Sequence, residues 1–351
     1  MAIALRRLGF SVALIGLPYN NKITFGESLN PDIKSYLLFL NIWNDFVKDN
    51  HLKSFGNLSS WGNNIIKENN FFFHPNTYGY HIDRQKFNKM FIDAAKQHGA
   101  QYLSPLFKTI DKDSAIFKLK IFDHNNFRII IDSKIMIDAT GRARWFSLRE
   151  GMYIKTFDHL CGYICFLKSQ SKNDTHPMTL IESSPNGWWY TALLPNKVRV
   201  VAFFTDYNLP FSKYLKTIDG WKKVLNKTQY VRKIIDDYEY DIYLGPYAIL
   251  SNSTRLEKVS GDNWLAIGDA AATFDPLSSN GVINAIDDAI DVSNMIKKHL
   301  EKEENLFDSY NSNVVKKFNN YLHKRSFYYS KEKRWRNSLF WKRNQSLFNR
   351  L

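Results

Sequence analysis

Residues 264–281 carry the pattern best suited to binding a ligand. An apolar run at residues 264–267 predicts a buried strand, and Gly268 and Asp269 follow it directly. Glycine lets the backbone approach a ligand without a Cβ, while a carboxylate can accept a hydrogen bond from a hydroxyl group. The following loop opens a helix, whose free amide groups and dipole favour a negative charge. Its candidate binding residues are Pro276, Ser278, Ser279 and Gly281.

A simpler interpretation of this string involves no ligand. Asp269 could cap a helix, and Ser278 with Ser279 could form an ordinary helix N-cap. A Gly-Asp pair alone is weak support for a binding site. The complete string at this spacing, directly after an apolar strand, favours the ligand site.

Three further segments combine small, acidic and basic residues in a similar way. They are Gly26–Leu29, Asp83–Phe87 and Ile137–Arg142. Arg84 stands at the start of an amphipathic helix predicted for residues 85–98, where it could contact a ligand or pair with a nearby carboxylate. We favour the ligand role because of the other segments. Asp138 and Gly141 fall in a turn after a predicted strand.

These segments resemble the superfamily of FAD-dependent monooxygenases and tryptophan halogenases, which has the p-hydroxybenzoate hydroxylase type of fold. Within it, the chain is most similar to flavoproteins that mature protein-derived quinone cofactors. That similarity lies in His51–Gly56, Gly187–Tyr190, Glu332–Trp335 and Phe340–Arg343. The resemblance implies bound FAD, with contacts from Arg84, Asp138, Gly141, Gly268, Asp269, Pro276, Ser278, Ser279 and Gly281.

The resemblance also implies a reaction. Reduced flavin would react with dioxygen, and a flavin hydroperoxide would hydroxylate an aromatic small molecule or a residue of a protein substrate. NAD(P)H or a separate flavin reductase would supply the electrons. The cofactor carries this chemistry while the protein orients it and excludes water. No side chain stands out in the sequence as a catalytic acid or base.

The sequence departs from the family pattern in three places. The Gly-x-Gly-x-x-Gly fingerprint should precede the helix in which this chain begins, so we expect a truncated chain without the first strand and the pyrophosphate loop. Gly16 stands where an acidic residue should bind the adenosine ribose. Residues 188–195 only echo the halogenase motif Trp-x-Trp-x-Ile-Pro, and no lysine stands out to hold a hypohalous species. We therefore expect hydroxylation and no chlorination, with a flavin-free relic or a partner-binding protein as the alternative.

Aromatic, histidine and cysteine residues give weaker signals. Trp188, Trp189 and Tyr190 could line a substrate pocket or simply pack a sheet. Cys161 and Cys165 fit no zinc pattern and read as buried small side chains, and we expect no metal site. His51, His74 and His81 have no carboxylate at a useful sequence spacing, so we expect core or surface histidines.

Composition favours a globular cytoplasmic protein without a membrane span. The 351 residues have a net charge of +14, and much of it lies near the end of the chain. The basic residues there are Lys324, Arg325, Lys331, Lys333, Arg334, Arg336, Lys342, Arg343 and Arg350. No nucleic-acid-binding motif accompanies them, so we expect no nucleic acid and instead a docking surface for an acidic protein partner.

The expected fold is α/β: a Rossmann-like FAD-binding domain, an inserted antiparallel substrate domain and a helical basic tail. The domains are predicted at residues 1–155 with 255–300, at 156–254, and at 301–351. Locally, the pattern predicts a helix at 48–52, a turn-rich stretch at 57–64 and a helix at 282–299.

Overall fold

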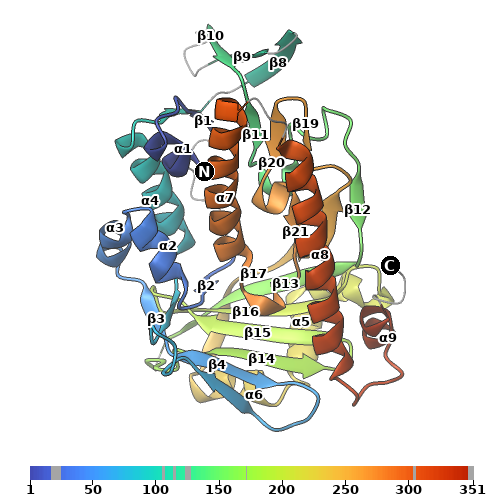
Figure 1. Ribbon diagram of the computed structural model, residues 1–351. Helices are drawn as coiled ribbons and strands as arrows, with labels where there is room; N and C mark the ends of the chain where they lie inside the picture. Colours follow the sequence, from blue (N-terminus) through green and yellow to red (C-terminus); the bar gives the residue numbers. More distant parts are fainter. Residues whose placement is uncertain are drawn as a thin grey trace.

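The molecule consists of a Rossmann-like α/β part and a large, mainly antiparallel sheet (Figure 1). The computed structural model describes residues 1–16, 25–104, 107–113, 116–122, 128–170, 172–302 and 306–346. This arrangement confirms the predicted fold class. Arg350 of the predicted tail lies outside the described residues.

Short parallel strand pairs form the centre of the Rossmann-like part. Strand β1 (Ala13–Ile15) pairs with β7 (Gln101–Leu103), and β11 (Met136–Asp138) pairs with β20 (Trp264–Ala266). The latter strand also pairs with β19 (Ser260–Gly261). Helices α1 (Ala2–Arg7), α4 (Arg84–Gln97) and α7 (Gly281–Lys302) lie beside them. The predicted helices at 85–98 and 282–299 are therefore confirmed.

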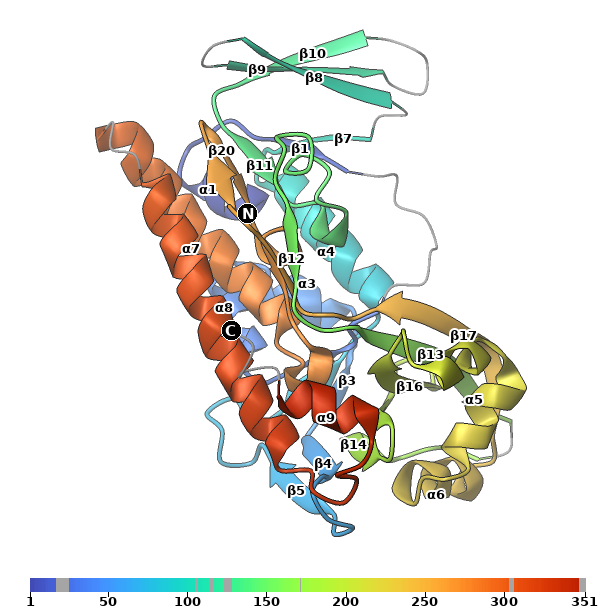
Figure 2. The ribbon, with the colours of Figure 1, turned by 90° about the vertical axis from the view of Figure 1, so that its right-hand side faces the viewer.

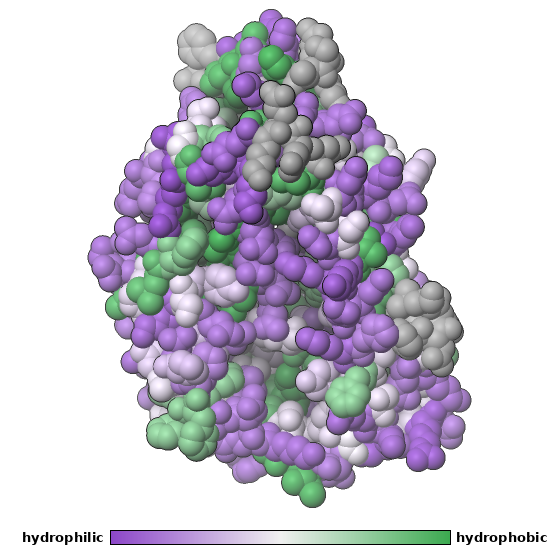
Figure 3. Space-filling model, viewed as in Figure 1, coloured by the Kyte–Doolittle hydropathy of each residue, from purple (hydrophilic) through white to green (hydrophobic). Residues whose placement is uncertain are grey.

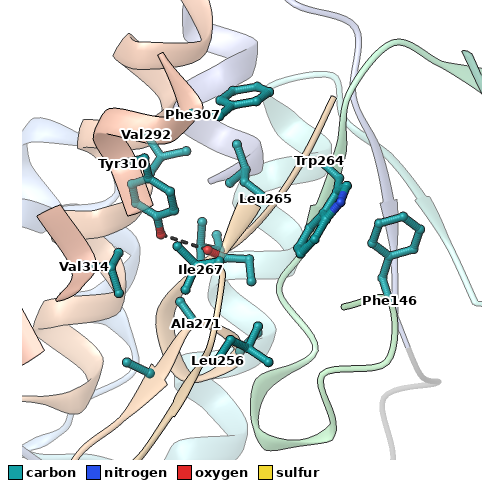
Figure 4. Packing of buried hydrophobic residues seen from close by; sticks show 14 of the residues in the cluster. Phe146, Leu256, Trp264, Leu265, Ile267, Ala271, Val292, Phe307, Tyr310 and Val314 are labelled. Atoms are coloured by element: carbon teal, nitrogen blue, oxygen red, sulfur yellow. Dashed lines mark hydrogen bonds between the residues drawn. The ribbon is translucent and has the colours of Figure 1, made fainter. Parts of the chain in front are cut away.

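Strand β20 is the buried centre of the main core. Its three residues are almost fully buried. Side chains of α7 and α8 (Phe307–Ser330), such as Val292 and Tyr310, cover one side, and Trp264 packs against Phe146 on the other (Figure 4). The Tyr310 hydroxyl donates a hydrogen bond of 2.8 Å to the Ala266 carbonyl oxygen. This packing fixes the strand end from which Gly268 and Asp269 emerge.

The large sheet has seven strands in the order β17, β13, β16, β15, β14, β4 and β5. Their bounds are Tyr240–Leu250, Leu160–Ser169, Val198–Asp206, Gly187–Leu193, Thr179–Ser184, Gly56–Ser60 and Lys67–Asn70. Only β4 and β14 pair in parallel. The predicted turn-rich stretch at 57–64 is wrong for the residues that form β4. Because β4 and β5 belong to this sheet, the sheet includes residues outside the range 156–254 that was predicted for the substrate domain. The predicted helix at 48–52 is also wrong: residues 52–54 form strand β3 (Leu52–Ser54).

Smaller elements complete the fold. Strands β2 (Ser28–Leu29), β6 (Gly79–His81) and β3 form one sheet, next to helices α2 (Ile33–Phe39) and α3 (Trp43–Lys48). Strands β12 (Ile154–Thr156), β18 (Thr254–Leu256) and β21 (Ala272–Thr273) form another. Strands β8 (Phe107–Asp113), β9 (Ile116–Phe122) and β10 (Arg128–Ser133) form a sheet that projects from the end of the molecule (Figure 2).

Different helices cover the two faces of the seven-stranded sheet. One face packs against α5 (Ile218–Leu225) and α6 (Tyr230–Asp237). The other packs against the end of α8 (Phe307–Ser330) and against α9 (Leu339–Gln345) (Figure 2). With both faces covered, every residue of β16 is buried.

The residues predicted to form a basic docking tail are in part structural. Phe340 and Trp341 are fully buried, and the Trp341 indole nitrogen donates to the Ser184 carbonyl oxygen at 2.9 Å. Arg325 is buried as well, and Arg334 forms an ion pair with Glu332 at 2.6 Å. Arg325 is buried and cannot contact an acidic protein, so the prediction is wrong for this residue. Arg334 already has an acidic partner inside the chain. On the face in Figure 3, hydrophobic side chains occur in small separate groups.

Candidate functional site

A cavity of about 490 Å³ lies where the Rossmann-like part meets the large sheet. Nine of the sequence-predicted site residues line it: Arg84, Gly141, Trp188, Tyr190, Gly268, Asp269, Pro276, Ser279 and Gly281. Segments far apart in the sequence therefore converge on one space. Its volume falls in the range typical of cofactor and small-molecule sites.

Glycines make one wall of this cavity open to a flat ligand. A Cβ added at Gly141 or at Gly281 would have no heavy atom within 4 Å. At Gly268, where φ is +55°, a Cβ would approach the Cβ of Ala285 to 3.3 Å. Gly268 is thus needed for its left-handed conformation and for close packing against α7. Gly141 and Gly281 leave room that a cofactor can occupy.

The N-terminus of α7 opens onto the same wall. Gly281 begins this helix of 22 residues, and the backbone amide of Asn284 donates to the Asn280 carbonyl oxygen at 2.9 Å. The amides before Asn284 lie in the first turn, where helix geometry provides no acceptor. The side chain of Asn280 is itself held by Asn30 at 2.8 Å. These free amides and the helix dipole suit the negative charge of a reduced flavin ring.

Asp275 anchors the loop that leads into α7, a role that the sequence did not reveal. Its carboxylate accepts hydrogen bonds from the Leu277 amide at 2.9 Å, from Arg325 Nε at 2.9 Å and from the Tyr329 hydroxyl at 2.6 Å. The latter two partners lie on α8, some fifty residues away in sequence. The loop is therefore fixed to the C-terminal helix. An aspartate directly before Pro276 is the only local signal of this role.

Asp138 shapes a turn and does not line the cavity. Its carboxylate accepts hydrogen bonds from the amides of Thr140, Phe146 and Ser147 and from the hydroxyls of Thr140 and Ser147. Burial alone would raise the pKa of Asp138, but these hydrogen bonds outweigh it and hold the pKa below its ordinary value. Asp138 therefore supports the turn that carries Gly141 and does not face the cavity, as a contact with the cofactor would require. Ser278 is exposed and does not line the cavity either.

Asp269 faces the cavity among three arginines. Solvent reaches it through the open cavity, although protein surrounds it on most other sides. This surrounding protein raises the pKa of Asp269, and the positive charges of Arg142, Arg144 and Arg84 limit the rise. Arg142 and Arg144 are held in place by Asn252 and by the Ala270 carbonyl oxygen.

We expect replacement of Asp269 by alanine to weaken FAD binding roughly 10- to 150-fold, because a charge-assisted hydrogen bond contributes about 1.5–3 kcal/mol. Flavin fluorescence titration measures the affinity, and thermal unfolding checks that the fold is retained. The matched variant Asp269→Asn keeps an acceptor oxygen and should lose less. Unchanged affinity in Asp269→Ala would remove Asp269 from the site.

Glu27, from the Gly26–Leu29 segment, is a buried acid that lines the cavity, and its sequence pattern indicated no role for it. Its side-chain oxygen Oε1 has no hydrogen-bond partner among the described residues, and neither does the buried Nε of Arg84 nearby. Burial raises the pKa of Glu27 to about 7, while its own backbone amide and the charge of Arg84 act in the opposite direction. Glu27 and Arg84 also line a smaller adjoining cavity of about 190 Å³. Two buried polar atoms without partners are what a site for a polar ligand would leave open.

The aromatic residues of β15 divide between the two faces of the sheet. Trp188 and Tyr190 line the cavity, and the Trp188 ring stacks on Phe204 with centroids 4.2 Å apart. Trp189 points to the opposite face, where it packs against Trp221. Side chains alternate along a strand, so three consecutive aromatics cannot share one wall. The assignment of Trp189 to the substrate pocket is therefore wrong.

The histidines and cysteines take structural places. His51 and His81 are buried, and His74 lies 3.1 Å from the carboxylate of Asp32. Both cysteines are free and buried. Within the described ranges, no cluster of three or more histidine, cysteine or acidic side chains could hold a metal ion. Each helix in the same part of the chain is too short or too polar to span a membrane.

Comparison with known proteins decides the family. A family model described as tryptophan halogenase matches residues 25–349. The chain belongs to the tryptophan halogenase family. LodB of Marinomonas mediterranea, which is named as an FAD-dependent oxidoreductase, is 24% identical over 324 residues that cover 92% of this chain and 86% of LodB.

Solved structures of other proteins share the fold. CmlS, a flavin-dependent halogenase, superimposes with a TM-score of 0.83 at 20% identity; the match covers 98% of this chain and 64% of CmlS. QhpG, a peptidyl tryptophan dihydroxylase essential for tryptophylquinone cofactor biogenesis, superimposes with a TM-score of 0.70 at 16% identity and covers 98% and 75% of the two chains. The chain thus spans about two thirds of the length of CmlS. These matches confirm the resemblance that the sequence motifs indicated.

Proposed function

We propose that this family member is an FAD-dependent monooxygenase that hydroxylates an aromatic group, either of a small molecule or of a residue in a protein. The observation that carries the proposal is the shared cavity. One wall consists of Gly268, Asp269 and the α7 N-terminus, and the other consists of the sheet residues Trp188 and Tyr190. A flat cofactor and an aromatic substrate can therefore meet in one space.

FAD is the cofactor, and the residues present fit its ring system. Gly141 and Gly281 leave open space on the cavity wall, the α7 N-terminus offers amides for a negative ring edge, and Asp269 offers an acceptor for a hydroxyl. When bound, the flavin supplies the activated oxygen that aromatic hydroxylation needs. The protein contributes position and the exclusion of water.

The second wall is suited to holding an aromatic ring. Trp188, Phe204 and Ala202 give it apolar and aromatic surface, and Tyr190 adds a hydroxyl group. Glu27 lies at the same cavity with a pKa of about 7, so it can hold a proton or release one near neutral pH. We assign Glu27 as the group that exchanges protons with the substrate or the reduced cofactor.

Two observations favour hydroxylation over halogenation. Among the described residues that line the cavity there is no lysine, the side chain that we looked for to hold a hypohalous species. QhpG, which shares the fold, is named as a dihydroxylase of a peptidyl tryptophan. A peptidyl substrate is therefore part of the proposal, together with NAD(P)H or a separate flavin reductase as the electron source. The two free cysteines suit a reducing compartment, and we propose the cytoplasm.

The test starts from the purified chain, FAD and a reducing system of NADH with a flavin reductase. Indole serves as the aromatic probe, with bromide either present or omitted, and mass spectrometry identifies the product. We expect one bound FAD per chain and a product that gains one oxygen atom from isotopically labelled dioxygen. A brominated product would overturn the proposed hydroxylation and identify the reaction as halogenation. A colourless chain that stays colourless with added FAD would favour a flavin-free partner-binding protein.

The same assay tests the role of Glu27. Product formation by the wild-type chain should change between about pH 6 and 8, because a group with a pKa near 7 loses its proton in that window. Glu27→Gln should remove this pH dependence and lower the rate roughly 100-fold or more. The same pH profile in Glu27→Gln and wild type would exclude Glu27 as the proton-holding group.

A further inference from the structure

A chain of hydrogen bonds runs from the cavity to the buried side chain of His81. The Tyr190 hydroxyl lies 2.6 Å from Ser28 Oγ, which lies 3.3 Å from Thr179 Oγ1. Thr179 Oγ1 lies 2.9 Å from His81 Nε2, and His81 Nδ1 lies 2.9 Å from the Leu193 carbonyl oxygen. His81 and Thr179 are almost completely buried, so bulk water does not compete for the two hydrogen bonds of the His81 ring.

At the His81 end of this series of hydrogen bonds, only one arrangement of the donor hydrogens is possible. The Leu193 carbonyl oxygen can only accept, so His81 Nδ1 must carry a hydrogen and donate it. The pKa of His81 is lowered to about 4, mainly by burial. The hydrogen bond to Leu193 acts in the opposite direction, and the charge of Arg199 adds to the lowering. The ring is therefore neutral at pH 7, and Nε2 has a free lone pair. Thr179 must donate its hydroxyl hydrogen to that nitrogen.

The donor of each remaining hydrogen bond, from Thr179 outward to the cavity, is fixed in the same way. Thr179 has one hydroxyl hydrogen and has given it to His81, so its oxygen accepts from Ser28. Ser28 in turn uses its only hydrogen on Thr179, so its oxygen accepts from the Tyr190 hydroxyl. Burial keeps Tyr190 protonated by raising its pKa, with the charge of Glu27 acting in the same direction. The Tyr190 hydrogen therefore points toward Ser28 and is not available to a ligand in the cavity.

We propose that Tyr190 presents its phenol oxygen to the cavity as a hydrogen-bond acceptor and selects aromatic substrates that carry an N–H or O–H donor. Indole, pyrrole and phenol rings belong to this class. An ether or furan oxygen at the same place would face the Tyr190 oxygen with no hydrogen between them. The ionised form of Glu27, at the same cavity, adds a second acceptor. This inference rests on the proposed aromatic substrate and adds that the polar group on its ring is a hydrogen-bond donor.

Indole and benzofuran test it, because the two rings have nearly the same shape but differ in having a donor or an acceptor. Calorimetric titration of the chain, with and without FAD, measures both dissociation constants. We expect the wild-type chain to bind indole about 3- to 10-fold more tightly, the worth of one net hydrogen bond. Equal binding of the two probes, or no saturable binding of either, would overturn the inference.

Three variants separate the hydrogen-bond chain from simple packing. Tyr190→Phe removes the acceptor oxygen and should make the two probes bind equally. Thr179→Val leaves Ser28 without its acceptor, so Ser28 can turn and donate to Tyr190, and the preference for indole should fall. Thr179→Ser keeps the hydroxyl and should keep the preference. A full preference for indole in Thr179→Val would also contradict the inference.

FAD titration of the same samples separates this inference from the proposed function. A wild-type chain that binds FAD but does not prefer indole overturns only the role of Tyr190. A chain that prefers indole but does not bind FAD overturns the proposed oxygenase and leaves the hydrogen-bond chain in place.

Discussion

Replacing Arg325 with alanine should lower the free energy of unfolding by about 3–5 kcal/mol, because the change leaves buried carboxylates without their counter-charge. Arg325 is 3% exposed. Its Nε donates to Asp275 at 2.9 Å, and its Nη2 donates to Asn344 Oδ1 at 2.6 Å and lies 3.5 Å from Asp158. The positive charges in the predicted basic tail therefore include one that holds the core together.

The loss in Arg325→Ala should depend on pH. Burial already raises the pKa of Asp275, and Arg325 and the Tyr329 hydroxyl hold that rise in check. Without Arg325 the folded-state pKa of Asp275 rises further above its unfolded value. A group with a raised folded-state pKa favours the folded state below its unfolded pKa, and this contribution is lost as the pH rises through the folded value. The variant should therefore be closest to wild type in acid and weakest at alkaline pH.

Urea unfolding of wild type and variant at about pH 5 and pH 8 measures both effects. Lys324→Ala is the matched control, because Lys324 is the exposed neighbour on the same helix and should change stability by only about 0.5 kcal/mol or less. If Arg325→Ala were no less stable than this control, the assigned role of the buried cluster would be wrong.

The second large effect concerns the cofactor wall. Gly281→Leu should weaken FAD binding by about 1–3 kcal/mol, or roughly 5- to 150-fold, because the new side chain would fill space that the ring needs. A Cβ at Gly281 would meet no heavy atom within 4 Å, so the protein itself should tolerate the change. Stability and cofactor affinity are thereby separated in one variant.

Flavin fluorescence titration gives the affinity, and a thermal melt without flavin gives the stability. Ser278→Leu is the control: Ser278 lies in the same loop, is exposed and does not line the cavity. Its FAD affinity should match wild type. If Gly281→Leu bound FAD as tightly as Ser278→Leu does, the ring would have to lie elsewhere in the cavity.

The sequence alone identified those features that depend on short-range chemistry. The strand, glycine turn and helix of residues 264–302 follow from local patterns, and the structure contains them. Asp83 caps α4 by accepting hydrogen bonds from the amides of Gln85 and Lys86, as an aspartate before a helix should. Arg84, the first residue of this helix, lines the cavity as its position at the helix start suggested.

Only the tertiary structure decided which groups face the site and which support it. The direction of Trp189 depends on the register of β15, which short apolar and aromatic runs do not fix. Asp275 and Arg325 lie far apart in sequence, so nothing local could show that they pair. The same is true of Tyr190, Ser28 and His81, which three different strands bring together. Local interactions are encoded within a few residues, whereas buried polar contacts are set by packing across the whole fold.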